Sequence, residues 1–162
     1  TELDWWESSE MAGVRIHCVP VQHWSQRNLT DRNQALWGGW VIEHGAQRLF
    51  FSGDTGYSHD FMDIARRFGP FDFAAIPIGA YEPRWFMAPF HVNPAEAVQI
   101  HLDLDARYSL GIHWGAFELT DEPLDEPPVV LQQELARRGV APDRFFVLRH
   151  GETWRIPAAP AR

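Results

Sequence analysis

The sequence predicts an α/β layered fold, in which a mixed sheet carries helices on at least one face. Early in the chain, apolar runs come in pairs separated by turn residues, which is typical of antiparallel hairpins. Later, segments with helical periodicity alternate with short apolar runs, which indicates helices packed against strands. Because 162 residues with 45% hydrophobic content can build one core, we expect one domain over residues 1–156 and a frayed tail over 157–162.

Two hairpins are expected first. Residues 3–6 and 14–22 would form the strands of one hairpin, on either side of a polar connection. Residues 36–43 and 48–52 would form the other, with Gly45 in its turn because glycine tolerates the backbone angles that a tight turn requires.

A helix is predicted next, over residues 58–68, and the dipeptide Gly-Pro at 69–70 ends it. The apolar side chains that would share its buried face are Phe61, Ile64, Ala65 and Phe68. The nearly continuous apolar run over residues 71–78 then predicts a strand that is covered on both faces.

The connection over residues 79–93 contains glycine and proline without any periodicity, so it predicts a long loop. The sequence NPAE at 93–96 supplies an N-cap, a proline at the first helical position and an acidic third residue. A helix is therefore predicted over residues 94–104. The strand expected over residues 107–112 ends at His113.

The last part of the chain begins with a proline-rich loop. A helix is predicted after it, over residues 129–138, and Gly139 closes that helix. Strands over residues 144–148 and 153–156 complete the predicted sheet.

The composition excludes some classes of partner. The formal net charge is -8, from 22 acidic and 14 basic residues, and no basic block is present, so we expect no nucleic-acid partner. No apolar stretch approaches the roughly 20 residues of a membrane-spanning helix. The acidity disfavours electrostatic adsorption to an anionic membrane but leaves a peripheral apolar contact open. The single cysteine, Cys18, can form no intrachain disulfide and is expected to be buried.

The start of the chain has neither a methionine nor the order of a secretory signal, and it reads as the beginning of a fragment. On this interpretation the N-terminal signal region lies outside the chain. The compartment stays open, with the bacterial cytoplasm and the membrane periphery as the two interpretations.

Three potential metal ligands stand where extended apolar runs end: His23, Asp54 and His113. Imidazole nitrogen and carboxylate oxygen together suit zinc, and ligands at strand ends can converge on one edge of a sheet. Each residue also has a simpler interpretation. An aspartate after a strand is commonly part of an Asx turn or a helix cap, and a histidine there is commonly a surface or hydrogen-bonded core residue. Three in equivalent positions favour the metal site.

The long loop holds a further set of candidates. His91 is either a loop histidine without a task or a residue that orients substrate, protonates a leaving group or stabilises an oxyanion. The apolar residues of this loop, Met87, Pro89, Phe90 and the aromatic pair Trp85 and Phe86, either pack into the core or contact an acyl chain or lipid. With Tyr81 and Arg84, this pair forms the predicted substrate-binding set.

Several strings extend across almost the whole chain: DRNQALWGGWVI, FFSGDTGY, RRFGPFDFAAIPIGAYEPRWFM, HVNPAEAVQIH and IHWGAF. They closely resemble the N-acyl-phosphatidylethanolamine-hydrolysing phospholipase D group of the metallo-β-lactamase superfamily, which includes RomA-like bacterial relatives. The resemblance implies an αββα sandwich of which this chain is the C-terminal half, with the helices on the outer face of its sheet. The N-terminal half would supply the motif H-x-H-x-D-H. That motif does not occur here, so this half is expected to be absent.

The resemblance also implies a zinc site with two ions in the intact protein, and one or none in this chain alone. By position, His23 would complete the first zinc site, Asp54 would bridge the ions and His113 would complete the second. His91 corresponds to the histidine implicated near the reacting phosphodiester. Asn93 departs from the aspartate that is common in the motif, although both residues cap helices.

The implied activity is zinc-dependent hydrolysis of a phosphodiester in N-acyl phospholipid-like substrates, with Asp54 and His91 as catalytic residues. We expect the chain alone to be inactive without its N-terminal half. One alternative is a non-enzymatic half-site scaffold or interaction module. Another is the same fold acting on a different ester or lactone. Apolar surface left uncovered by a missing half also predicts a homo-oligomer.

Overall fold

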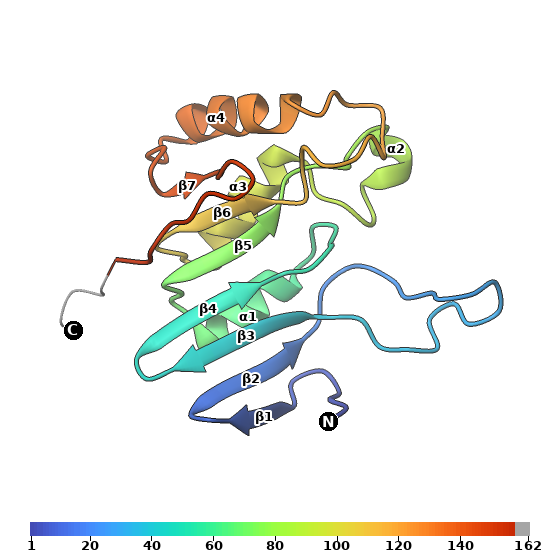
Figure 1. The fold of residues 1–162 in the computed structure, drawn as a ribbon, viewed down its shortest axis with the longest axis vertical. Coiled ribbons are helices and arrows are strands. Elements are labelled where there is room, and N and C mark those ends of the chain that lie inside the picture. The colour runs from blue at the N-terminus through green and yellow to red at the C-terminus, as the bar shows by residue number, and fades with distance from the viewer. Residues whose placement is uncertain (158–162) are drawn as a thin grey trace.

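The computed structural model describes residues 1–157 and contains one mixed sheet with helices on one face (Figure 1). The strands are β1 (Ser8–Met11), β2 (Val14–Val19), β3 (Gly39–His44), β4 (Gln47–Phe51), β5 (Phe73–Pro77), β6 (Ser109–Ile112) and β7 (Phe145–Phe146). The helices are α1 (Asp60–Phe68), α2 (Arg84–Met87), α3 (Pro94–Asp103) and α4 (Glu126–Arg138). The predicted α/β class is confirmed.

The strands lie side by side in their order along the chain. The first four pair antiparallel, and β4 through β7 pair parallel. Each parallel pair is joined through a helix, because a parallel connection must return the chain to the edge where it started. The hairpin of β3 and β4 is confirmed, with Gly45 in its turn at a φ of 58°.

The first strand differs from its prediction. Residues 3–6 are not a strand; β1 instead begins at Ser8, inside the segment predicted to be a polar connection, and pairs with β2. Its residues are mostly exposed, so the segment carries no apolar pattern that could reveal a strand. The backbone N–H of Trp6 donates to the carbonyl of Cys18, and Trp6 has a φ of 71°, which bends the chain before β1 begins.

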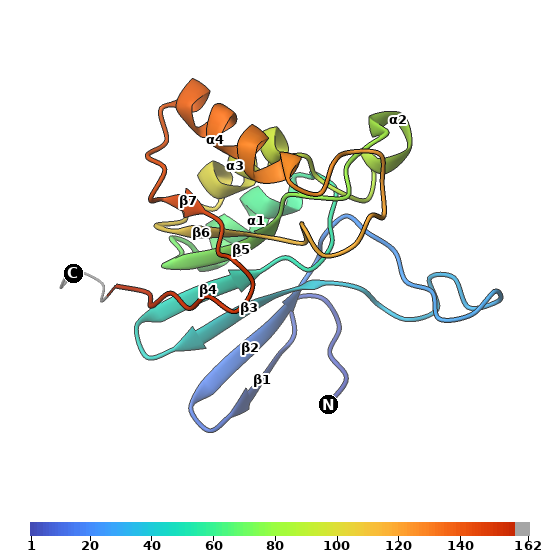
Figure 2. The ribbon, with the colours of Figure 1, turned by 45° about the horizontal axis from the view of Figure 1, so that its top comes forward.

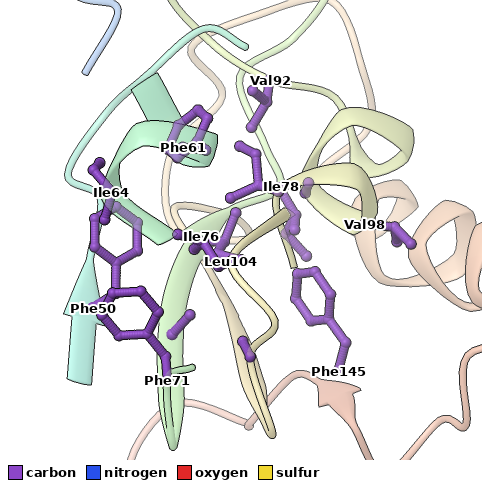
Figure 3. Packing of buried hydrophobic residues seen from close by; sticks show 14 of the residues in the cluster. Phe50, Phe61, Ile64, Phe71, Ile76, Ile78, Val92, Val98, Leu104 and Phe145 are labelled. Atoms are coloured by element: carbon purple, nitrogen blue, oxygen red, sulfur yellow. The ribbon is translucent and has the colours of Figure 1, made fainter. Parts of the chain in front are cut away.

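The helices α1, α3 and α4 cover one face of the sheet (Figure 2). Phe50 of β4 packs on Phe61 of α1 and on Phe71, and this aromatic group joins the buried aliphatic side chains of β5 and α3 (Figure 3). The helix predicted over residues 58–68 is confirmed from Asp60, with Phe61 and Ile64 fully buried. This layer holds the sheet whose edge carries the candidate site.

The helix α3 also begins as predicted. The side chain of Asn93 accepts a hydrogen bond from the backbone of Glu96, and Glu96 accepts one from the backbone of Asn93, which completes a capping box. The helix α4 starts three residues before the predicted residue 129. Pro127 and Pro128 lie in its first turn, where a missing N–H costs no helical hydrogen bond. The Gly139 end is confirmed, with a φ of 68°.

The end of the chain differs most. Only Phe145–Phe146 pairs as a strand, and the predicted strand over residues 153–156 does not form within the described residues. Instead, Trp154 packs against Phe73, Tyr108 and Phe146 on the sheet face opposite the helices. The predicted frayed tail lies almost entirely outside the described residues. No helix within residues 1–157 is long and apolar enough to cross a bilayer.

Candidate metal centre

The candidate ligands meet at one edge of the sheet because the strands that precede them run in the same direction. Antiparallel pairing reverses the chain twice between β2 and β4, and parallel pairing keeps β6 aligned with β4. His23 follows β2, Asp54 follows β4 and His113 follows β6 directly. His91 reaches the same place from the loop before α3.

The four side chains form one cluster. Ligand atoms of His23, Asp54 and His91 all lie within 4.8 Å of one another. Nε2 of His113 lies 3.5 Å from Oδ1 of Asp54. The ring of His91 lies 5.4 Å from that of His23 and 5.3 Å from that of His113, between centroids. The predicted ligands are thus brought together, and the predicted catalytic His91 lies among them.

The nitrogens that face the cluster are free to bind. Nδ1 of His23 lies 2.9 Å from the backbone carbonyl of Trp24, which identifies Nδ1 as the protonated nitrogen and leaves the lone pair on Nε2. Within residues 1–157, Nε2 of His23 and Nδ1 of His91 are buried and have no hydrogen-bond partner. Buried polar atoms are normally paired, so these two require an explanation. A zinc ion fits this set of imidazole and carboxylate donors.

The backbone is shaped to bring the ligands close. Gly53 has a φ of 63° immediately before Asp54, and glycine takes this left-handed conformation without strain. His113 has a φ of 58°, which costs a non-glycine residue roughly 1 to 3 kcal/mol and is typical of functional positions. A Cβ at Gly79 would lie only 2.4 Å from the carbonyl oxygen of His113, so only glycine allows this approach.

Burial controls the charge of His91. Loss of water around its ring lowers the pKa to about 4, and the neighbouring Asp54 opposes part of this effect. His91 is therefore neutral at pH 7. A neutral imidazole can offer a lone pair, as a ligand or as a hydrogen-bond acceptor.

Arg84 holds the loop that carries His91. Its guanidinium donates to the carbonyl oxygens of His91 at 2.8 Å and Tyr81 at 3.3 Å, and to the carboxylate of Glu96 at 2.8 Å. Glu96 also belongs to the capping box at Asn93, so the loop is fastened to the start of α3. The sequence assigned Arg84 to substrate contact, and its hydrogen bonds here are to the protein.

The other predicted substrate residues are placed differently from one another. Tyr81 is buried, and its hydroxyl donates to Glu126 at 2.6 Å. Trp85 and Phe86 lie on the short helix α2, which the sequence analysis did not predict, and are 83% and 56% exposed. The alternative in which this pair packs into the core is therefore wrong.

Two aromatic residues beside the site, Trp24 and Phe90, are not in the predicted substrate-binding set, although Phe90 belongs to the apolar part of the long loop. The ring of Trp24 stacks on His23 at 5.9 Å, and the ring of Phe90 lies 6.2 Å from His23. Phe90 also contacts Phe86 at 6.4 Å, which links the site to the exposed aromatic residues of α2. Both residues adjoin a candidate histidine in the sequence, and this adjacency was the signal available.

The sequence and the fold of this chain are similar to those of known proteins. Residues 1–114 match the sequence model described as Beta-lactamase superfamily domain. The N-acyl-phosphatidylethanolamine-hydrolyzing phospholipase D 1 of Caenorhabditis elegans is 46% identical over 161 residues, which cover 95% of this chain and 45% of that protein. Outer membrane protein RomA of Klebsiella pneumoniae is 38% identical over 63% of this chain and 75% of its own length.

Solved structures share the fold. Igni18, a metallo hydrolase from Ignicoccus hospitalis, matches with a TM-score of 0.71 at 18% identity, over 94% of this chain and 58% of that one. The chain spans less than half the length of the Caenorhabditis elegans relative. Since the superfamily sequence pattern matches residues 1–114, which is more than half of the chain, the chain belongs to the beta-lactamase superfamily.

Proposed function

We propose that this chain carries part of the active site of a zinc-dependent hydrolase, which cleaves a phosphodiester in N-acyl phospholipid-like substrates. The supporting observation is the cluster of His23, Asp54, His91 and His113, which converges from four separate segments. Two imidazole nitrogens of this cluster, Nε2 of His23 and Nδ1 of His91, are buried and have no hydrogen-bond partner in residues 1–157. Histidines that only fill a core or a surface would pair these atoms.

Each residue of the cluster would have its own role in metal binding, set by its position. His23 would bind zinc through Nε2, the nitrogen left free by the contact of Nδ1 with Trp24, and His113 would bind through its own imidazole. Asp54 has two carboxylate oxygens and lies near both His23 and His113, so it could bridge two ions. Bound zinc lowers the pKa of a coordinated water toward neutrality and stabilises negative charge on phosphoryl oxygens.

In the proposed reaction, the oxygen of water forms a bond to phosphorus, and the bond from phosphorus to the leaving alcohol oxygen breaks. The leaving oxygen takes up a proton, so the products are a phosphomonoester and an alcohol. His91 lies between the ligands, where the N–H of its neutral ring can donate a hydrogen bond to the leaving oxygen or to a phosphoryl oxygen. Arg84 keeps the backbone of His91 in this position.

The remaining metal ligands would come from a segment outside these residues, because the motif H-x-H-x-D-H does not occur in the sequence. We propose that this segment also covers the sheet face opposite the helices. Trp40 and Phe51 are partners in the register of β3 and β4, and they alternate with the buried Val41 and Phe50. They are 36% and 43% exposed, which leaves apolar surface suited to such a cover.

A lipid-like substrate is supported by two observations. The names of the relatives from Caenorhabditis elegans and Saccharomyces cerevisiae both specify hydrolysis of N-acyl-phosphatidylethanolamine, at 46% and 41% identity. The aromatic residues from Trp24 to Trp85 extend from the metal centre to the surface. Exposed tryptophan and phenylalanine suit a peripheral contact with a lipid surface.

Metal analysis tests the proposal. In a protein that joins this chain to an H-x-H-x-D-H segment, we expect two zinc ions per molecule and hydrolysis of N-acyl-phosphatidylethanolamine. Asp54→Ala should lose metal and activity together, and Asp143→Ala, at an exposed aspartate remote in sequence from the cluster, should lose neither. Full activity of Asp54→Ala with two bound ions would refute the assignment.

The second candidate is a scaffold or interaction module with at most one weakly held metal ion. The exposed Trp40 and Phe51 favour self-association of the 162-residue chain when it stands alone. Sedimentation of that chain at several concentrations, combined with zinc titration, separates the two candidates. Association without zinc binding would favour the module.

A further inference from the structure

A cavity of about 410 Å³ opens beside the metal centre. Its walls are formed by the end of β5, the end of β6 and the loop that leads to α4. Representative lining residues are Ala80, His113, Trp114, Leu119, Leu124 and Pro127. Small-molecule pockets usually span about 300 to 1,000 Å³, so the volume suits one narrow ligand.

The cavity is chemically suited to an uncharged, apolar group. Glu122 is in its lining, but both carboxylate oxygens accept backbone N–H groups, from Tyr81 at 3.1 Å and Glu82 at 3.0 Å. The indole N–H of Trp114 donates to the carbonyl of Gly111 at 3.2 Å. Glu122 and Trp114 are therefore engaged by the protein. Thr120 and His150 also line the cavity, while most of the other lining side chains are aliphatic or aromatic.

The metal centre lies between this cavity and a second apolar region. His113 lines the cavity, whereas His23 contacts Trp24 and Phe90, which continue toward the exposed α2. His91 contacts both histidines and so lies between the two regions. A phosphodiester with an apolar group on each side of its phosphorus matches this arrangement.

We propose that the cavity beside His113 binds the N-acyl chain of the substrate, while the diacylglycerol side faces the aromatic residues near His23. This assignment rests on the proposed function. A cavity of about 410 Å³ suits a single chain, whereas Trp85 and Phe86 are 83% and 56% exposed and are therefore available to a bilayer surface. The chain in the cavity would orient the phosphoryl group at the metal centre.

Substrates that differ only in the N-acyl group test the proposal. The assay uses the protein joined to its H-x-H-x-D-H segment and phosphatidylethanolamines that carry N-acetyl, N-octanoyl or N-palmitoyl groups. In Leu124→Trp, the larger ring fills the cavity. We expect kcat/KM to fall about tenfold or more for the N-palmitoyl substrate and little for the N-acetyl substrate, since burial of each methylene aids binding. The exposed Leu102→Trp on α3 is the control and should leave both unchanged.

Hydrolysis of bis(4-nitrophenyl) phosphate, which has no acyl chain, separates damage to the metal centre from filling of the cavity. Leu124→Trp should hydrolyse it at the wild-type rate. An equal loss for all N-acyl lengths, or no loss for any, would overturn the assignment of the chain to this cavity.

A binding measurement does not depend on catalysis. A dansyl-labelled long-chain N-acylethanolamine should bind the 162-residue chain, and the exposed Leu102→Trp should bind it equally well. Leu124→Trp should bind it at least about tenfold more weakly. Leu119→Asp, at a residue that is 66% exposed, adds a charge to the lining without altering the core and should also weaken binding. If these two variants bind the probe more weakly but no hydrolysis occurs, the assignment of the acyl chain to the cavity is supported and the proposed reaction is refuted. If the probe binds all variants alike, the cavity assignment fails.

Discussion

We expect acid to destabilise this fold through a buried histidine that is remote from the candidate metal centre. His101 on α3 is 5% exposed, its Nδ1 lies 2.8 Å from the hydroxyl of Ser109, and its ring packs on Phe145 at 5.7 Å. Burial and, to a lesser extent, the nearby charge of Arg144 together lower the pKa of His101 to about 4, from 6.5 in the unfolded chain, against a small opposing effect of Asp105. The folded state therefore resists protonation of this ring.

The direction of the effect follows from the pH at which His101 is protonated in the folded and in the unfolded chain. Between pH 6.5 and about 4, the unfolded chain is protonated at His101 and the folded chain is not. The contribution of His101 to the unfolding free energy is therefore fully present above pH 6.5 and is lost as the pH falls toward 4. A difference of about 2.5 pKa units corresponds to about 3 kcal/mol in all, of which about 2 kcal/mol is lost at pH 5.

Urea unfolding at pH 7.5 and pH 5.0 measures this loss. His91 also has a pKa lowered to about 4, so the wild-type protein alone does not isolate His101. In His101→Asn, the drop in unfolding free energy between the two pH values should be smaller than in the wild type by about 2 kcal/mol. His44→Asn, at an exposed position on β3, is the matched control and should keep the wild-type drop. An equal drop in His101→Asn and the wild type would refute the reasoning.

Three further predictions concern particular residues. Asn93→Ala removes the cap of α3 and should lower the unfolding free energy by about 1 kcal/mol in urea titration, whereas Asn93→Asp should keep most of it. Leu131→Ala leaves a cavity at a fully buried position and should lower the unfolding free energy by about 2 to 5 kcal/mol in the same assay. The control Leu102→Ala, at a residue that is 45% exposed, should lower it far less. Similar losses in the two variants would contradict the assigned core. Gly79→Ala would force a Cβ against the carbonyl of His113, so zinc binding measured by titration should weaken at least about tenfold. Unchanged affinity would show that zinc binding does not need the close approach of the Gly79 and His113 backbones.

Local patterns were sufficient where neighbouring residues determine the structure. The capping box at Asn93 is written in four consecutive residues, and the hairpin turn at Gly45 in even fewer. Local patterns were insufficient where contact with a residue distant in the sequence determines the local structure. β1 is mostly exposed and gains its strand conformation by pairing with β2, and Trp154 packs on three aromatic residues of the sheet instead of extending it.

By itself, the sequence determined the α/β class and the three candidate ligands that follow strands: His23, Asp54 and His113. It could do so because apolar periodicity and turn residues are local, and ligands at strand ends follow from them. Only the tertiary structure decided that His91 joins these residues, that Arg84 holds its loop, and that a cavity adjoins the cluster. These features depend on the direction and order of the strands, which bring distant segments to one edge. No local pattern encodes that convergence.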